Sequence, residues 1–115
     1  MSFQEAERKR IEATLDAFLR KNRPPVHIRA QLDYAYLIHN QSIELHEVRP
    51  RWDDATQQMV RSFAKATYFK SRKIWRVYWL RADLKWHIYE PTPSVGTLEE
   101  FLAVVRKDKH ACFYG

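Results

Sequence analysis

Glycine and cysteine are both scarce in this chain of 115 residues, which contains two glycines and one cysteine. With only Gly96 and Gly115 available, the sequence has no glycine-rich loop to cradle a phosphate and no glycine-flanked nucleophilic serine. P-loop, Rossmann and serine-hydrolase sites are therefore excluded. The single cysteine, Cys112, cannot form a disulfide within the chain, which suits a reducing compartment. We interpret Cys112 as a small buried apolar group.

Long apolar runs are also missing. No stretch approaches the roughly eighteen apolar residues that a membrane-spanning helix requires. The first eight residues carry charges of both signs and no apolar segment, so we expect no signal peptide. A chain of this length fits one domain, spanning residues 1–115. We therefore expect a single, soluble, cytoplasmic domain with no membrane partner.

The positive charge is concentrated in one part of the chain. The formal net charge is +6, yet residues 1–60 carry nine basic and nine acidic side chains. Residues 61–89 carry eight basic side chains and one acidic side chain, together with eight of the 16 aromatic residues. The sequence thus has a basic segment that is also rich in aromatic rings.

A helix and a β-hairpin are predicted in the first third of the chain. Apolar residues at helical spacing indicate an amphipathic helix over 4–21, and the prolines at 24–25 end it. Alternating apolar residues on both sides of 40–41 then predict two strands joined by a tight turn. The predicted register sets two apolar pairs opposite each other: Ile38 with Ile43, and Tyr36 with Leu45.

Three further strands are predicted, at about 61–70, 74–82 and 85–90. In the last hairpin we pair Arg81 with Trp86. This register places Trp75, Val77, Trp79, Arg81, Trp86 and Ile88 on one face. It places Arg76, Tyr78, Leu80, His87 and Tyr89 on the other face.

The C-terminal part predicts the end of the sheet and a second helix. Pro91 and Pro93 are expected to end the sheet, and Thr97 with Glu100 forms a capping box that opens a helix. The predicted fold class is α+β, with an antiparallel, mostly meandering five-stranded sheet flanked by an N-terminal and a C-terminal helix. A partly closed barrel is the alternative.

The basic, aromatic-rich hairpin is the leading candidate for a functional site. Lysine and arginine attract phosphates, and aromatic rings on a strand can stack on unpaired bases. The predicted function is a non-catalytic binding module for nucleic acid or another polyanion, with six contact residues: Arg72, Lys73, Arg76, Tyr78, Lys85 and His87. The structural interpretation is that the rings fill the core while the basic groups are solvated and protect sheet edges.

Two other functions stay open. The first is a small hydrolase or nuclease-like enzyme that uses Glu47, Arg49 and Lys65, of which the first two fall on the apolar side of their predicted strand. A structural ion pair at the rim of the sheet explains the same pattern. The second is a homodimerising protein-interaction domain that uses exposed aromatic residues or an open sheet edge.

The sequence predicts no metal site and no cofactor. None of the five histidines forms the helical pair of a zinc protease, and His110 with Cys112 supplies too few ligands for zinc. Asp53 and Asp54 are adjacent acids that could bind Mg²⁺, but a solvated turn explains them equally.

Several segments together resemble a known family. They are Glu47-Val48-Arg49-Pro50-Arg51-Trp52, Ala64-Lys65-Ala66-Thr67-Tyr68, the tryptophan-rich stretch 75–91, Leu98-Glu99-Glu100-Phe101-Leu102 and the closing Cys112-Phe113-Tyr114-Gly115. With these segments the chain resembles domain-of-unknown-function family 3024, a family of short bacterial proteins. The resemblance implies a single bacterial domain. It supplies no catalytic residue.

Overall fold

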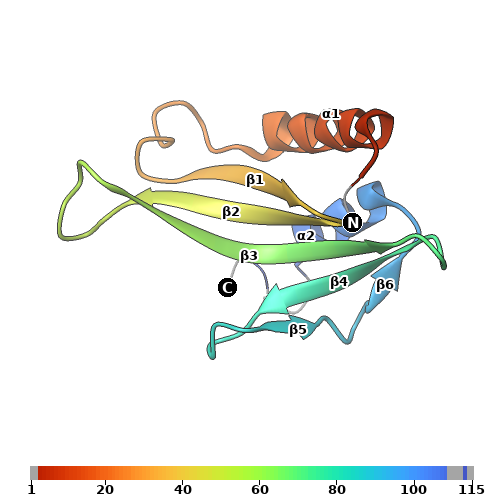
Figure 1. The fold of residues 1–115 in the computed structure, drawn as a ribbon. Coiled ribbons are helices and arrows are strands. Elements are labelled where there is room, and N and C mark those ends of the chain that lie inside the picture. Colours follow the sequence, from red (N-terminus) through yellow and green to blue (C-terminus); the bar gives the residue numbers. More distant parts are fainter. Residues whose placement is uncertain (1–2, 109–112, 114–115) are drawn as a thin grey trace.

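Two helices and an antiparallel sheet make up the part of the chain that the computed structural model describes, residues 3–108 and residue 113 (Figure 1). The elements follow in the order α1 (Glu5–Asn22), β1 (Asp33–His39), β2 (Ser42–Pro50), β3 (Gln58–Phe69), β4 (Ile74–Leu80), β5 (Trp86–Ile88), β6 (Ser94–Val95) and α2 (Leu98–Lys107). The predicted α+β class and flanking helices are confirmed. Within the described residues, neither helix is long and apolar enough to cross a membrane.

The sheet is a meander in the order β1-β2-β3-β4-β5, and β6 is added to the outer edge of β4. The Tyr89 N–H donates to the Val77 carbonyl, and the Val77 N–H donates to the Pro93 carbonyl, each at 2.9 Å. β5 and β6 therefore act as one edge strand interrupted by a loop. The prediction that Pro91 and Pro93 end the sheet is wrong, because β6 resumes pairing directly after them.

The register of the first hairpin is as predicted, with Ile38 opposite Ile43 and Tyr36 opposite Leu45. Between β2 and β3 the register shifts, since Leu45 pairs with Ala64 while His46 pairs with Ser62. Phe63 is therefore the extra residue of a β-bulge, and Phe63 and Ala64 are both buried.

Both helices pack against the same face of the sheet, and the hydrophobic core lies between them and the central strands. The stripe of α2 is buried in this core as Leu98, Phe101, Leu102 and Val105. The predicted stripe of α1 is confirmed in part, since Ile11 and Leu15 are buried in the core while Phe18 and Leu19 are half-buried. Of the predicted capping box only the N-cap half forms: the Glu100 N–H donates to Thr97 Oγ1 at 3.1 Å, while the Glu100 carboxylate accepts from the Thr97 hydroxyl rather than from its backbone N–H. In Figure 1, α2 lies behind the sheet and α1 along the β1 side, so no helix covers the near face.

The register of the β4–β5 hairpin differs by one residue from the prediction. Leu80, not Arg81, pairs with Trp86, and the Arg81 N–H donates to the Lys85 carbonyl across the turn at 3.2 Å. Leu84 in this turn has a left-handed backbone with φ 62°, which is uncommon for a residue other than glycine. As a result Trp86 and Ile88 join Arg76, Tyr78 and Leu80 on the uncovered face, while His87 and Tyr89 join Trp75, Val77 and Trp79 on the helix-covered face.

Candidate functional site

Basic and aromatic side chains gather on the uncovered face of β3, β4 and β5. Lys65 of β3 lies directly opposite Tyr78 of β4. Trp86 of β5 lies opposite Leu80, two residues after Tyr78 on β4. Because side chains alternate along a strand, Phe69 and Arg76 point to this same face. We call this set the platform: Lys65, Phe69, Arg76, Tyr78 and Trp86. All five side chains are half-buried, so each presents part of its surface to solvent.

The cations of the platform lie over its rings. The Lys65 ammonium is 5.7 Å from the centroid of the Tyr78 ring and 5.7 Å from that of Trp86. The Arg76 guanidinium carbon is 4.7 Å from the centroid of Phe69. These are cation–π distances. The platform therefore brings the apolar surface of the rings and the positive charge of Lys65 and Arg76 together in one place.

The one acidic side chain next to Lys65 is engaged elsewhere. Glu44 is the cross-strand neighbour of Lys65 on β2. Its Oε1 accepts a hydrogen bond from Ser62 Oγ at 2.8 Å and lies 3.4 Å from His46 Nε2. Within the described part of the chain, Lys65 has no ion pair with a carboxylate. Among the described residues, no carboxylate therefore forms a direct ion pair that would neutralise its charge.

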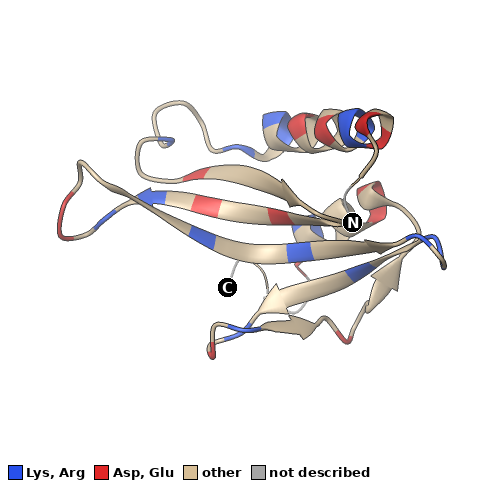
Figure 2. Cartoon of the chain, viewed as in Figure 1, with Lys and Arg blue, Asp and Glu red and all other residues tan. Residues whose placement is uncertain are grey.

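Exposed basic residues stand at both ends of β4. Lys70, Arg72 and Lys73 lie in the β3–β4 turn and are exposed. Lys85 is exposed in the β4–β5 turn at the opposite end. Figure 2 shows basic residues along β3 and β4 and in both of these turns. Positive charge thus lies beyond both ends of the platform, along the direction of β4.

The structure brings most of the six predicted contact residues near the platform. Arg76 and Tyr78 belong to it, while Arg72, Lys73 and Lys85 occupy the turns at its two ends. His87 does not join them, because the corrected register turns it to the helix-covered face.

His87 instead pairs with an aspartate of the neighbouring turn. Its Nε2 lies 2.8 Å from Asp83 Oδ2. This contact and the Lys85 N–H hold the pKa of Asp83 below its usual value. The predicted face of His87 is therefore wrong: its side chain lies on the side of the sheet opposite the platform and contacts Asp83 of the β4–β5 turn.

The residues of the alternative enzyme site do not converge. Arg49 Nε lies 3.4 Å from Glu47 Oε2, and Glu47 faces the helix-covered side opposite Tyr34. Lys65 points to the uncovered face, because the buried residues on either side of it, Ala64 and Ala66, face the core. The sheet therefore separates Lys65 from the Glu47–Arg49 pair.

The four tryptophans divide in a way that the sequence does not reveal. Trp52 in the β2–β3 loop is 93% exposed and Trp75 is 6% exposed, while Trp79 and Trp86 are half-buried. Sequence reasoning missed three members of the platform: Phe69, Trp86 and Lys65, the last of which it placed only in the alternative enzyme site. The period-two alternation of β3, with Ala64, Ala66 and Tyr68 on one face, is the signal that could have placed Phe69 on the same face as Lys65. His110 and Cys112 lie outside the described residues.

Comparison with known proteins adds one positive finding. The profile of the family described as domain of unknown function DUF3024 matches residues 3–115. Curated proteins and solved structures give no significant match. The family resemblance noted in the sequence is therefore confirmed over almost its full length. The chain belongs to the domain-of-unknown-function family DUF3024.

Proposed function

We propose that this protein binds single-stranded nucleic acid on the uncovered face of its sheet. The observation that carries the proposal is the Lys65 ammonium held 5.7 Å from the rings of both Tyr78 and Trp86 on a face that no helix covers. Exposed rings on a sheet stack on unpaired bases, and neighbouring cations attract the phosphates between those bases. One small area of the platform offers both kinds of contact.

The basic turns support a path for the nucleic-acid backbone along β4. Lys70, Arg72 and Lys73 at one end and Lys85 at the other are exposed. The seven residues of β4 span roughly 23 Å at about 3.3 Å per residue. Phosphates at the two ends of such a path would flank the bases stacked on the platform. A duplex keeps its bases paired and stacked, so it would reach the cations but not the rings.

The test measures binding of a fluorescently labelled 12-nucleotide single strand by anisotropy, at several salt concentrations, against a duplex of the same sequence. We expect tighter binding of the single strand, and we expect Tyr78→Leu to weaken it by roughly fivefold to a hundredfold, the effect of losing one stacked base. Urea unfolding of the variant checks that the sheet is intact. Binding of the duplex at least as tight as that of the single strand, or no effect of Tyr78→Leu, would refute stacking.

The contribution of phosphate contacts is tested by a matched pair of triple variants. Changing Lys70, Arg72 and Lys73 to glutamine should reduce the magnitude of the salt slope by about two, since each phosphate contact on a single strand contributes roughly 0.7. The control changes the three adjacent basic residues 8–10 of α1 to glutamine, with the same loss of net charge. Equal losses in both triple variants would mean that net charge alone drives binding, and the proposed surface would be wrong.

A further inference from the structure

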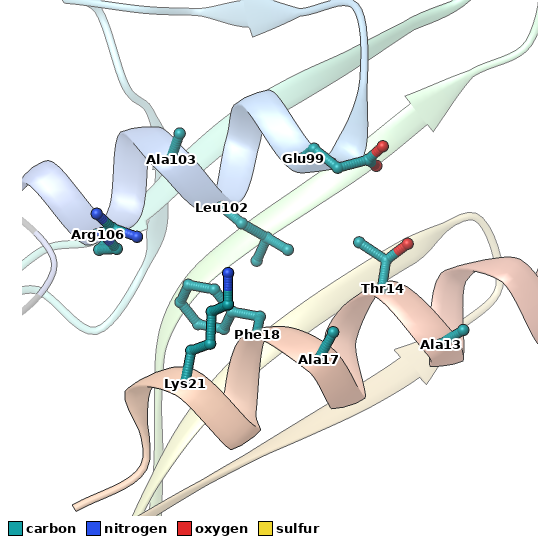
Figure 3. Close-up of a pocket in the computed structure, with 9 residues that line it drawn as sticks. All are labelled: Ala13, Thr14, Ala17, Phe18, Lys21, Glu99, Leu102, Ala103 and Arg106. Carbon is teal, nitrogen blue, oxygen red and sulfur yellow. The ribbon is translucent and has the colours of Figure 1, made fainter.

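An open groove of about 480 Å³ lies between the two helices, on the side of the sheet opposite the platform. The helices run side by side in the same direction and present small residues to each other (Figure 3). Ala13 and Ala17 of α1 and Ala103 of α2 line the space. Because alanine side chains are too short to meet across it, the helices leave a groove. Phe18 and Leu102 supply larger apolar surface to its lining.

The two ends of this groove differ in charge. Lys21 and Arg106, each in the last turn of its helix, line one end, and both are exposed. Neither has an ion pair within the described residues. Glu99 and Thr14 lie toward the other end (Figure 3). The groove therefore combines an apolar length with an unneutralised pair of cations at a single end.

We propose that the groove binds a linear amphiphilic anion, an alkyl carboxylate, with its head group between Lys21 and Arg106 and its tail along the alanines. The volume lies within the usual range of small-molecule sites, which are mostly apolar with a few polar groups that fix orientation. From Ala13 to Lys21 the helix rises roughly 12 Å, at about 1.5 Å per residue. This length matches a tail of about ten carbons lying parallel to the helices.

A second cavity continues the apolar path beyond the ten-carbon length. It shares Ala13, Thr14 and Glu99 with the first, and Ile11 and Trp75 line its inner part. Glu7 and Arg10 also line it, so a tail that extends this far meets charge of both signs. We therefore expect affinity to rise with each methylene up to about ten carbons and to increase less beyond that. Because the groove is open to solvent, each step should stay below the factor of about four for a fully buried methylene.

The experiment titrates decanoate, below its micellar concentration, by calorimetry and by two-dimensional amide NMR. Decyltrimethylammonium serves as the probe with the same tail and the opposite head-group charge. We expect decanoate to shift the amide signals of residues 13–21 and 99–106 and to bind at least tenfold more tightly than the cationic probe. Signals that do not move, shifts confined to the sheet, or equal binding of both probes would overturn the proposal.

Two variants separate a specific head-group site from general attraction. Lys21→Glu with Arg106→Glu should weaken decanoate binding at least tenfold and remove the preference over the cationic probe. The control, Arg8→Glu with Lys9→Glu, makes the same charge change on α1 outside both cavities. All four side chains are exposed, and urea unfolding confirms that both variants fold. Equal weakening by the two double variants would refute the assignment of the head-group site.

Discussion

Tyr36 connects α1 to the sheet and offers a direct test of how this helix is held. Its hydroxyl donates to Asp16 Oδ1 at 2.8 Å. The pKa of Tyr36 is raised from 10.0 to about 12. Partial burial is the largest cause, and the hydrogen bond to Asp16 is the next largest. Tyr36→Phe removes the hydroxyl and keeps the ring that packs against the core. The variant therefore isolates one polar contact between helix and sheet.

The expected effect changes with pH. At pH 8 the variant should lose about 1 kcal/mol of unfolding free energy, the usual value of such a hydrogen bond. A group whose pKa is raised by folding gives its full stabilisation below its unfolded pKa and loses it as the pH rises toward the folded pKa. A shift of two units corresponds at most to ~2.7 kcal/mol, and solvent screening reduces this to about 1 kcal/mol. The advantage of the wild type should therefore disappear between pH 10 and pH 12.

The assay is urea unfolding of both proteins from pH 8 to pH 12, together with the tyrosinate absorbance at 295 nm followed to about pH 13. The difference between the two absorbance titrations should show one tyrosine ionising near pH 12. Asp16→Asn is the matched control, because it keeps a hydrogen-bond acceptor and removes the charge, and it should lower that pKa. A stability difference that stays constant over the whole range, with an ionisation near pH 10, would refute the reasoning.

Two further predictions concern contacts that fix the ends of elements. Asp33 accepts a hydrogen bond from Arg23 Nε at 2.9 Å, and this contact lowers the pKa of Asp33; Asp33→Asn should therefore cost on the order of 1 kcal/mol at pH 7. Because folding lowers the pKa of Asp33, this loss of stability should shrink as the pH falls below about 4. Urea unfolding at pH 7 and pH 3 measures it, and an equal loss at both pH values would contradict the prediction. Thr97→Ala removes the cap of α2 and should cost about 1 kcal/mol in thermal unfolding, whereas Thr97→Ser should retain most of the stability; equal losses would argue against the cap.

The elements that could be predicted are those encoded by local signals. The turn at Asn40 has a left-handed backbone with φ 53°, which asparagine tolerates better than most residues, so the register of the first hairpin follows from the sequence. Thr97 and Glu100 mark the start of α2 through their own hydrogen bonds. In each case the residues that determine the geometry are neighbours in the chain.

The β4–β5 register could not be predicted because its turn carries no such signal. The left-handed position is occupied by Leu84, where glycine or asparagine would be expected. Both registers also place aromatic residues on both faces, so the pattern of β4 and β5 alone does not choose between them. This error exchanged the positions of Trp86 and His87. The bulge residue Phe63 packs its ring against Tyr34, which lies far away in the sequence, so no neighbouring residue marks the bulge.

The interrupted pairing at the outer edge of β4 also limits how the sheet can grow. β5 offers three residues and β6 two, and the segment between them contains two prolines. A proline has no N–H to donate, and fibrillar stacking requires a continuous row of free donors and acceptors. A strand from another molecule would find no such row on this side. Within the described residues, the edges left for a second chain are β1 and the first half of β3, residues 58–63, which β4 does not pair.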